Sequence, residues 1–166
     1  PVNGLIMGTR SGDIDQSVIF YLIDQLGYSP QEVSDILHNK SGMYGLTGYS
    51  DLRDIEEQAA NGNKQCQLAL DMNAYRIKKY IGAYTAAMNG VDALVFTAGI
   101  GENSDVIRKL VCADMEFFGI KLNEDKNKQR LKELRTINAE DSKVQVLVIP
   151  TNEELEIAQQ TYNLGI

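Results

Sequence analysis

The sequence predicts an α/β domain. Two apolar runs rich in strand-forming residues, 93–97 and 144–149, are each followed by the start of a helix, which is the alternation typical of such folds. The residues before 91 have instead the spacing of successive amphipathic helices. Because the first run carries no charge, we expect a strand that is buried on both faces. There is no internal repeat and no linker, so we expect a single domain over 1–166.

The composition limits the classes of function. The chain has 166 residues, 43% of them hydrophobic, and its 16 basic and 23 acidic residues give a net charge of −7. This charge argues against nucleic-acid and anionic-membrane partners, which favour a basic face. Cys66 and Cys112 lack metal-ligand spacing, so we expect buried thiols and a cytoplasmic location. No segment resembles a signal peptide or a membrane span. Since the chain starts at Pro1 without a methionine, we expect a piece of a longer protein.

The chain begins with a glycine-punctuated loop, 4–15, whose polar residues lie around Arg10. Either Asp13 or Asp15 can cap the apolar helix that follows and ends at Gly27. Charge spacing alone makes Arg10 a surface arginine paired with Asp13.

A second helix starts at 29–30, Ser-Pro, because proline suits the first helical turn. The only histidine, His38, lies in the last turn of this helix, where a histidine is usually an electrostatic partner of the helix end and not a catalyst. Residues 41–50 contain three glycines and are expected to form a loop. Ser50 or Asp51 then caps a short helix.

Residues 64–88 are expected to form one long helix. Its apolar residues recur at alternating steps of four and three, which predicts a continuous buried stripe. The stripe consists of Leu70, Ala74, Ile77, Ile81, Tyr84 and Met88.

The stretch 91–111 predicts a buried strand, a turn on Gly99 and Gly101, and a helix capped by Asn103 or Ser104. Such an arrangement leaves backbone N–H groups free at a positive helix end, where a phosphate or ribose can approach. Glycine turns of this spacing also occur where nothing binds. The spacing therefore leaves both a nucleotide site and a plain turn open.

The C-terminal part is expected to contain a short strand at 117–122, a solvated helix and loop at 123–143, and a strand at 144–149. Thr151 or Asn152 then caps a last helix with glutamates in its first turn. The helix dipole alone is a sufficient reason for those glutamates.

Three segments resemble the signatures of the acetate kinase family, in the family's order. They are Met7-Gly8-Thr9-Arg10-Ser11-Gly12-Asp13-Ile14-Asp15, Phe96-Thr97-Ala98-Gly99-Ile100-Gly101-Glu102-Asn103 and Pro150-Thr151-Asn152-Glu153-Glu154-Leu155. Ala98 stands where the family usually has glycine. The resemblance covers essentially the whole chain. It implies the C-terminal, nucleotide-binding lobe of the actin-like ATPase (ribonuclease H-like) fold, with a mixed sheet flanked by helices.

The resemblance also implies roles for individual residues. In the family, the arginine matching Arg10 holds the carboxylate and the phosphoryl group in transit, which makes it catalytic. The glutamate matching Glu153 is associated with the magnesium of the bound nucleotide. An apolar side chain and an arginine plane suit the stacking of adenine. The positions implied to contact the nucleotide are Asp51, Leu52, Arg53, Gly99, Ile100, Gly101, Glu102 and Asn103.

The reaction implied by the resemblance is magnesium-dependent transfer of the γ-phosphoryl group of ATP to acetate, giving acetyl phosphate and ADP reversibly, in a homodimer. The chain alone is expected to be inactive, because the family's acetate pocket and further catalytic residues lie in a part that precedes it. Two alternatives stay open. One is a propionate or butyrate kinase, since the acyl pocket decides the substrate. The other is a nucleotide-responsive binding module, against which the loop of Arg10 argues.

Overall fold

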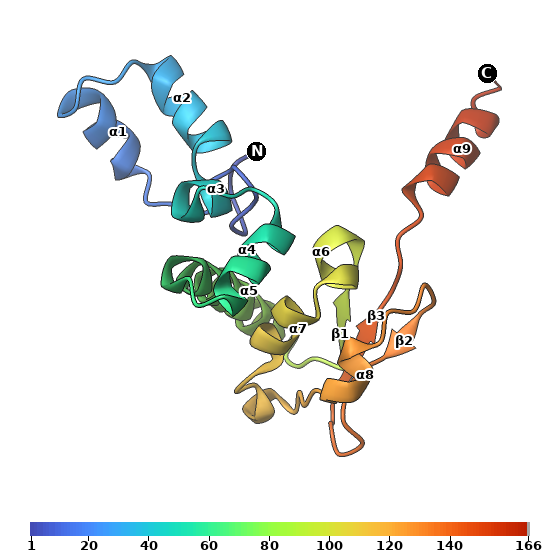
Figure 1. The fold of residues 1–166 in the computed structure, drawn as a ribbon. Coiled ribbons are helices and arrows are strands. Elements are labelled where there is room, and N and C mark those ends of the chain that lie inside the picture. Colours follow the sequence, from blue (N-terminus) through green and yellow to red (C-terminus); the bar gives the residue numbers. More distant parts are fainter. Residues whose placement is uncertain (166) are drawn as a thin grey trace. The chain divides into compact units, whose positions relative to one another are not determined.

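The computed structural model describes residues 1–165, and the chain divides into two compact units, 1–87 and 88–166. The first unit is helical, and the second contains a three-stranded sheet with short helices (Figure 1). The prediction of an α/β chain with a mixed sheet is confirmed.

The first unit is built from five helices joined by short connections. They are α1 (Ser17–Asp24), α2 (Pro30–Asn39), α3 (Gly42–Thr47), α4 (Leu52–Ala60) and α5 (Lys64–Met88), the last of which ends at the first residue of the second unit. Helices α1 and α2 lie side by side (Figure 1). Helix α2 starts where predicted, because Ser29 and Glu32 exchange side-chain and backbone hydrogen bonds in a capping box. Asp15 accepts from the N–H of Ser17 at the start of α1.

The prediction of a loop at 41–50 is wrong, because six of these residues form α3. Two of its three glycines serve close backbone contact instead of flexibility. A Cβ atom on Gly42 would lie 2.2 Å from the carbonyl oxygen of Met7, and one on Gly45 would lie 2.7 Å from that of Lys40. The backbone of α3 therefore packs directly on the chain segments before it.

Helix α5 has the predicted bounds, but its apolar stripe is only partly buried. Cys66, Leu70 and Ala74 are buried in its first half. Tyr84 and Met88, at its far end, are 60% and 64% exposed. The prediction of a continuous buried stripe is wrong at this end, where both side chains are exposed, whereas Ile77 and Ile81 are half-buried.

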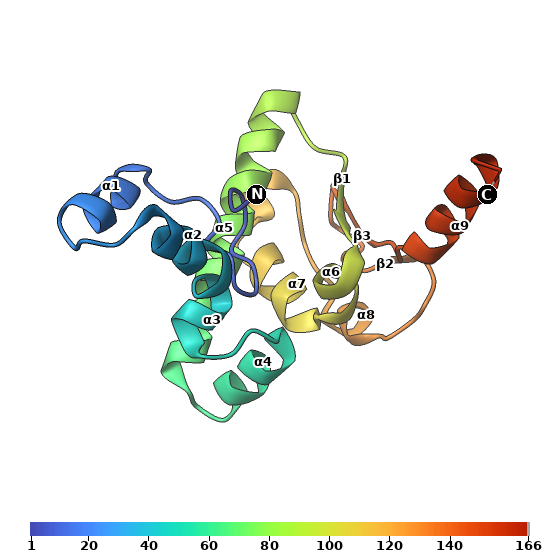
Figure 2. The ribbon, with the colours of Figure 1, turned by 90° about the horizontal axis from the view of Figure 1, so that it is seen from above.

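The second unit contains a sheet in the order β1-β3-β2, with β1 (Ala93–Phe96) parallel to β3 (Gln145–Val148) and β2 (Arg135–Thr136) antiparallel to β3 (Figure 2). Its helices are α6 (Ala98–Asn103), α7 (Asp105–Cys112), the 3₁₀ turn η1 (Glu116–Phe118), α8 (Glu124–Lys128) and α9 (Glu153–Asn163). The buried side chains of β3 are Val146 and Val148, since alternate residues of a strand face opposite sides.

Strand β1 is buried on one face only, whereas we expected burial on both faces. Phe96 is 8% exposed, whereas Val95 is 45% exposed. The strand lies at an edge of the sheet, and within the described chain only one of its faces is covered. An uncharged run therefore did not distinguish a covered strand from a half-covered one.

Two other strand predictions need correction. Residues 117–122 form the end of η1 and a single bridge from Leu122 to Asn138, not a strand. The stretch 123–143 contains β2, which the sequence did not predict. This strand has two residues, one of them Arg135, so it has no apolar pattern. The strand at 144–149 is confirmed as β3.

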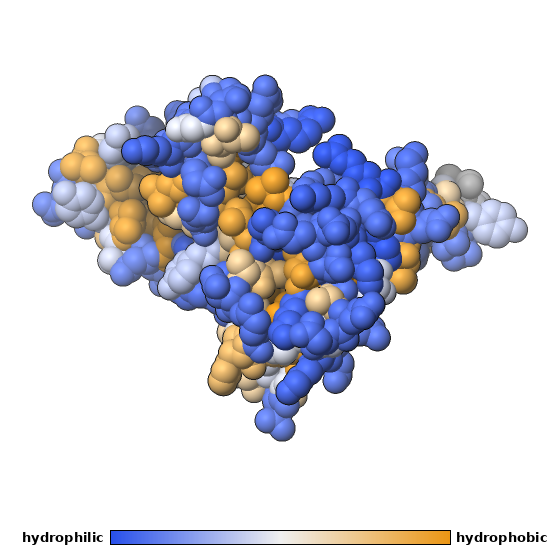
Figure 3. All heavy atoms as spheres, turned by 60° about the horizontal axis from the view of Figure 1, so that its bottom comes forward, coloured by the Kyte–Doolittle hydropathy of each residue, from blue (hydrophilic) through white to orange (hydrophobic). Residues whose placement is uncertain are grey.

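Apolar side chains remain at the surface of both units. Figure 3 shows apolar atoms exposed in patches between polar residues. Helix α9 has no buried residue, and its Ile157 is 65% exposed. Within the described residues, no helix has both the length and the apolar character needed to cross a membrane. Cys66 and Cys112 are buried and form no disulfide, as predicted.

The contact at Gly42 gives a test of the packing. Gly42 has φ +61° and no room for a Cβ atom, whereas Gly48 has φ +82° and open space around it. We expect Gly42→Ala to lower the free energy of unfolding by about 2–5 kcal/mol, from backbone strain and overpacking together. Gly48→Ala should lower it by only about 1–2 kcal/mol, from backbone strain alone. Urea denaturation measures both, and equal effects would contradict this account.

Candidate functional site

Arg10 lies on an exposed part of the loop that precedes α1. Among residues 1–165 its guanidinium makes no hydrogen bond and no ion pair. The pairing with Asp13 that charge spacing favoured is wrong, because Tyr80 donates to Oδ2 of Asp13 over 2.5 Å and Gly4 donates to Oδ1 over 2.7 Å. The guanidinium of Arg10 is therefore exposed and unpaired within the described residues.

The segment 51–53 adjoins this loop, since a Cβ atom on Gly8 would lie 3.2 Å from the carbonyl oxygen of Ser50. Of the two candidate caps for α4, Asp51 is the cap, because its Oδ1 accepts from the N–H of Arg53 over 2.9 Å. The Arg53 guanidinium also donates through Nε over 3.0 Å and through Nη2 over 2.5 Å. These bonds to Arg53 lower the pKa of Asp51 to about 2.

The pairing of Asp51 and Arg53 has a geometric consequence. The Arg53 side chain is 89% exposed, and one edge of its guanidinium is held by the carboxylate. A fixed edge leaves the planar faces open. Such a plane is a suitable surface for an aromatic base.

The glycine segment is a short helix, α6, and not the open turn that we expected. The backbone conformation also differs from the expected one, in which Gly99 and Gly101 would take φ values that other residues avoid. Ala98 is the residue in the left-handed region, with φ +57°, and Gly99 is not. Gly99 has open space where a Cβ atom would lie, whereas Gly101 would place one 3.1 Å from the backbone of Phe96. Gly101 thus permits packing on β1, while Gly99 leaves the surface of α6 unobstructed.

The ends of α6 distinguish the two predicted caps. Ser104 caps the next helix, α7, by accepting from the N–H of Ile107 over 2.9 Å. Asn103 is not a cap, because its amide donates to the carbonyl oxygen of Gly99 over 2.8 Å within α6. At the other end, the hydroxyl of Thr97 donates to the carbonyl oxygen of Ile149 and does not cap α6. The first N–H groups of α6 therefore have no side-chain cap.

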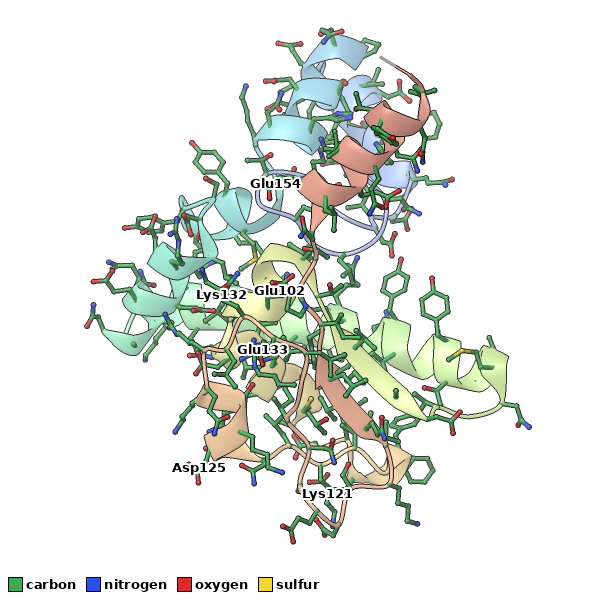
Figure 4. The ribbon with its side chains drawn as sticks, turned by 90° about the vertical axis from the view of Figure 1, so that its right-hand side faces the viewer. Glu102, Lys121, Asp125, Lys132, Glu133 and Glu154 are labelled. Atoms are coloured by element: carbon green, nitrogen blue, oxygen red, sulfur yellow. The ribbon has the colours of Figure 1, made fainter. Side chains whose placement is uncertain are left out.

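Glu102 connects the glycine segment to the start of α9. Its Oε1 accepts from the N–H of Thr151 over 2.7 Å and from its hydroxyl over 3.0 Å. Figure 4 shows Glu102 on α6 beside the chain that leads from β3 to α9. Asn152 is the cap of α9, and Glu153, its first residue, is exposed. The structure thus brings the glycine segment and the segment of Glu153 together.

The chain matches one family over almost its whole length. The model of the Acetokinase family matches residues 1–159. This chain belongs to the acetokinase family. Acetate kinase of Flavobacterium johnsoniae is 65% identical over 164 residues, which are 99% of this chain and 42% of that protein. Acetate kinase of Carboxydothermus hydrogenoformans is 57% identical over 166 residues, which are 100% of this chain and 42% of that protein.

Solved structures of an acetate kinase and a propionate kinase are also similar to this chain. The crystal structure of Porphyromonas gingivalis acetate kinase is similar with a TM-score of 0.91 at 47% identity, over 100% of this chain and 42% of that one. A propionate kinase from Francisella tularensis gives a TM-score of 0.88 at 41% identity, over 96% of this chain and 40% of that one. The predicted actin-like ATPase fold is thereby confirmed. This acetokinase-family chain spans about 42% of the length of the curated relatives it matches.

Two buried arginines support the glycine segment, and neither was predicted from the sequence. Arg108 on α7 is 2% exposed, and its Nη1 donates to the carbonyl oxygens of Gly101 and Glu102 over 2.9 Å each. Arg135 donates to the same oxygen of Glu102 over 3.2 Å. Burial, and then the charge of Arg135, lower the pKa of Arg108. A signal was present, because Arg108 lies between Ser104 and Cys112 at helical spacing on a buried face.

The residues that could hold a metal ion lie at the start of α9 in this acetokinase-family chain. No group of three or more His, Cys, Asp and Glu side chains could hold a metal ion in the part of the chain that the structure describes. Glu153 and Glu154 in the first turn of α9 offer exposed carboxylate oxygens. Mg²⁺ needs only one or two protein carboxylates when water and phosphate supply its other ligands, so these residues fit that ion.

The left-handed backbone of Ala98 is open to test. Ala98→Gly removes a conformation that costs about 1–2 kcal/mol for alanine, against an entropy cost of about 0.4–1 kcal/mol for the added glycine. We expect the free energy of unfolding to rise by about 0.5–1 kcal/mol. The control Ala83→Gly, within α5, should lower it by about 1 kcal/mol. A loss at both positions would show that φ at Ala98 stores no strain.

Proposed function

We propose that the full-length protein is an acetate kinase, which transfers the γ-phosphoryl group of ATP to acetate and gives acetyl phosphate and ADP reversibly. This chain would supply one lobe, with most of the nucleotide site. The observation that carries the proposal is the exposed guanidinium of Arg10, which has no partner among residues 1–165 and whose loop adjoins the segment 51–53 at Gly8. Membership of the acetokinase family supports the same reaction.

Phosphoryl transfer needs positioning and charge neutralisation more than covalent help from the protein. Arg10 would neutralise and orient the phosphoryl group in transit. Its planar fork suits two oxygens at once, which makes it a catalytic residue in this proposal.

The remaining predicted residues would seat the nucleotide. The adenosine would lie against Leu52 and the open face of Arg53, whose other edge is held by Asp51. The surface left open at Gly99, together with the uncapped N–H groups of α6, suits the phosphate and ribose side. Ile100, Gly101 and Asn103 would shape the same segment. Glu102 would hold this segment in place, because its carboxylate accepts hydrogen bonds from Thr151.

Magnesium would accompany the nucleotide. Glu153 would hold the ion, directly or through water, with Glu154 beside it. The ion, when bound, would neutralise charge on the phosphates. An exposed glutamate at a helix start keeps its oxygens available for a hard cation.

We further propose a cytoplasmic homodimer. The exposed apolar side chains of α5 and α9, such as Met88 and Ile157, support association with a second copy. The two buried cysteines, which form no disulfide, suit a reducing compartment. The two compact units would form one lobe of the full-length protein, and the chain alone would be inactive because the acetate pocket lies outside it.

A propionate kinase is the second candidate, and the structural match to the enzyme from Francisella tularensis favours it. The acetate kinase from Porphyromonas gingivalis is more similar in sequence, at 47% against 41% identity. Rates with acetate and propionate in the full-length protein separate the two. A nucleotide-responsive binding module would have no use for an unpaired arginine on the loop before α1.

Arg10→Ala tests the catalytic role. We expect kcat to fall by roughly a thousandfold or more, because a transition-state arginine is lost, while the affinity for ADP changes little. Arg10→Lys should recover only a small part of the activity, since lysine lacks the planar fork. Arg130→Ala, at another exposed arginine, serves as the control and should stay close to wild type. An Arg10→Ala enzyme that keeps more than a tenth of wild-type kcat would remove Arg10 from the site.

Glu153→Gln tests the metal side. We expect a higher magnesium concentration at half-maximal activity, because an anionic oxygen is removed from the surroundings of a hard cation. Glu156→Gln is the matched control, since Glu156 also lies in the first turn of α9 and adds negative charge to the same helix end. Equal magnesium requirements in the two variants would make Glu153 a helix-end charge only.

A further inference from the structure

The loop that carries Arg10 is closed at its base. The N–H of Gly4 donates to Oδ1 of Asp13 over 2.7 Å, and the N–H of Asp13 donates to the carbonyl oxygen of Gly4 over 3.0 Å. These reciprocal bonds join the two ends of a ten-residue segment. Arg10 is therefore displayed on a closed ring of backbone, which we call the arginine loop (residues 4–13).

One face of α5 holds the base of the arginine loop through three polar side chains. Asn73, which is 6% exposed, donates to the carbonyl oxygen of Ile6 over 3.1 Å. Nη1 of Arg76 donates to the carbonyl oxygens of Gly4 over 3.2 Å and Asp13 over 3.1 Å. The hydroxyl of Tyr80 donates to Oδ2 of Asp13 over 2.5 Å. Positions 73, 76 and 80 follow the three- and four-residue steps of a single helix face.

The protonation states of this contact are fixed near neutral pH. The hydrogen bond from Tyr80 and then that from Gly4 lower the pKa of Asp13. The hydrogen bond to Asp13 raises the pKa of Tyr80. The carboxylate is thus ionised and accepts with both oxygens, while the phenol keeps the proton that it donates. Arg76 adds a positive charge at 3.7 Å from Asp13.

The tip of the arginine loop is held separately. The N–H groups of Met43 and Tyr44 in α3 donate to the carbonyl oxygens of Met7 and Gly8 over 2.9 Å and 2.8 Å. The N–H of Ser41 donates to the carbonyl oxygen of Thr9 over 3.0 Å. With base and tip both bonded, the backbone around Arg10 is fixed and only its side chain remains free to meet a ligand.

We propose that Asp13, Arg76 and Tyr80 are positioning residues for Arg10 in the phosphoryl-transfer step. This inference rests on the proposed function. None of the three would contact the substrate. They act by holding the arginine loop so that the guanidinium of Arg10 is already in place when the phosphoryl group arrives, and small displacements of such a group are costly in rate.

Tyr80→Phe in the full-length protein tests the inference, because it removes one hydroxyl and keeps the ring. We expect kcat to fall by about 10- to 100-fold, while KM for ATP stays within about twofold, because the nucleotide contacts lie elsewhere. Tyr84→Phe is the matched control. Tyr84 lies one turn further along α5, is 60% exposed, and its hydroxyl makes no hydrogen bond within residues 1–165. Its kcat should equal that of wild type.

Asp13→Asn is a second variant, which keeps an oxygen for the N–H of Gly4 and removes the charge that Tyr80 and Arg76 share. It should show the same pattern of lowered kcat and unchanged KM. Wild-type kcat in both Tyr80→Phe and Asp13→Asn would overturn the inference. A rise in KM for ATP as large as the fall in kcat would also overturn it, because the contact would then support the nucleotide site in general.

A double-mutant cycle separates this inference from the proposed function. If Tyr80 acts through Arg10, Tyr80→Phe should cause little further loss in an Arg10→Ala background, measured at high enzyme concentration. A further loss equal to that in the wild-type background would overturn the positioning role. Near-wild-type kcat in Arg10→Ala itself would instead refute the catalytic role of Arg10, whatever Tyr80→Phe does.

Discussion

The candidate site depends on hydrogen-bond partners for the carbonyl groups of its irregular backbone, since a buried carbonyl group without a partner is costly. Regular helices and strands supply such partners internally, but the arginine loop and the end of α6 do not. In the first unit, Asn73 and Arg76 donate to carbonyl oxygens of the arginine loop. In the second unit, Arg108 and Arg135 donate to carbonyl oxygens at the end of α6. Both units thus hold a candidate functional segment by long side chains from a neighbouring element.

Because Arg108 and Arg135 hold the end of α6, they place positive charge next to the glycine segment. Arg108 is buried and bonded to neutral acceptors, the carbonyl oxygens of α6 and the side chain and backbone of Asn127. The carbonyl end of a helix carries partial negative charge, which a guanidinium stabilises. The desolvation that lowers the pKa of Arg108 is therefore offset by bonds that also fix α6. An arginine in this place combines support with electrostatics, which an apolar residue would not do.

The sequence predicted those features that are encoded locally. Ser29 and Asp51 cap their helices through bonds within a few residues, so their roles follow from short patterns. Helix α3 was missed because Gly42 serves a contact with a residue more than thirty positions earlier, Met7. In the site, the family signature located Arg10, but nothing near it in sequence indicated Tyr80, which lies 67 residues away from Asp13. Tertiary partners of this kind are invisible to periodicity.

The sheet explains why the glycine segment and the segment of Glu153 meet. Strands β1 and β3 are parallel neighbours, with Phe96 paired to Val148, so the chain leaves both at the same edge. Ligands of open α/β sheets bind beyond the carboxyl ends of parallel strands for this reason. Two side-chain hydrogen bonds then connect the segments that follow β1 and β3. Thr97 donates to the carbonyl oxygen of Ile149, and Glu102 accepts from Thr151. Residues some fifty positions apart are thereby held in one place, as a nucleotide and its metal ion would require.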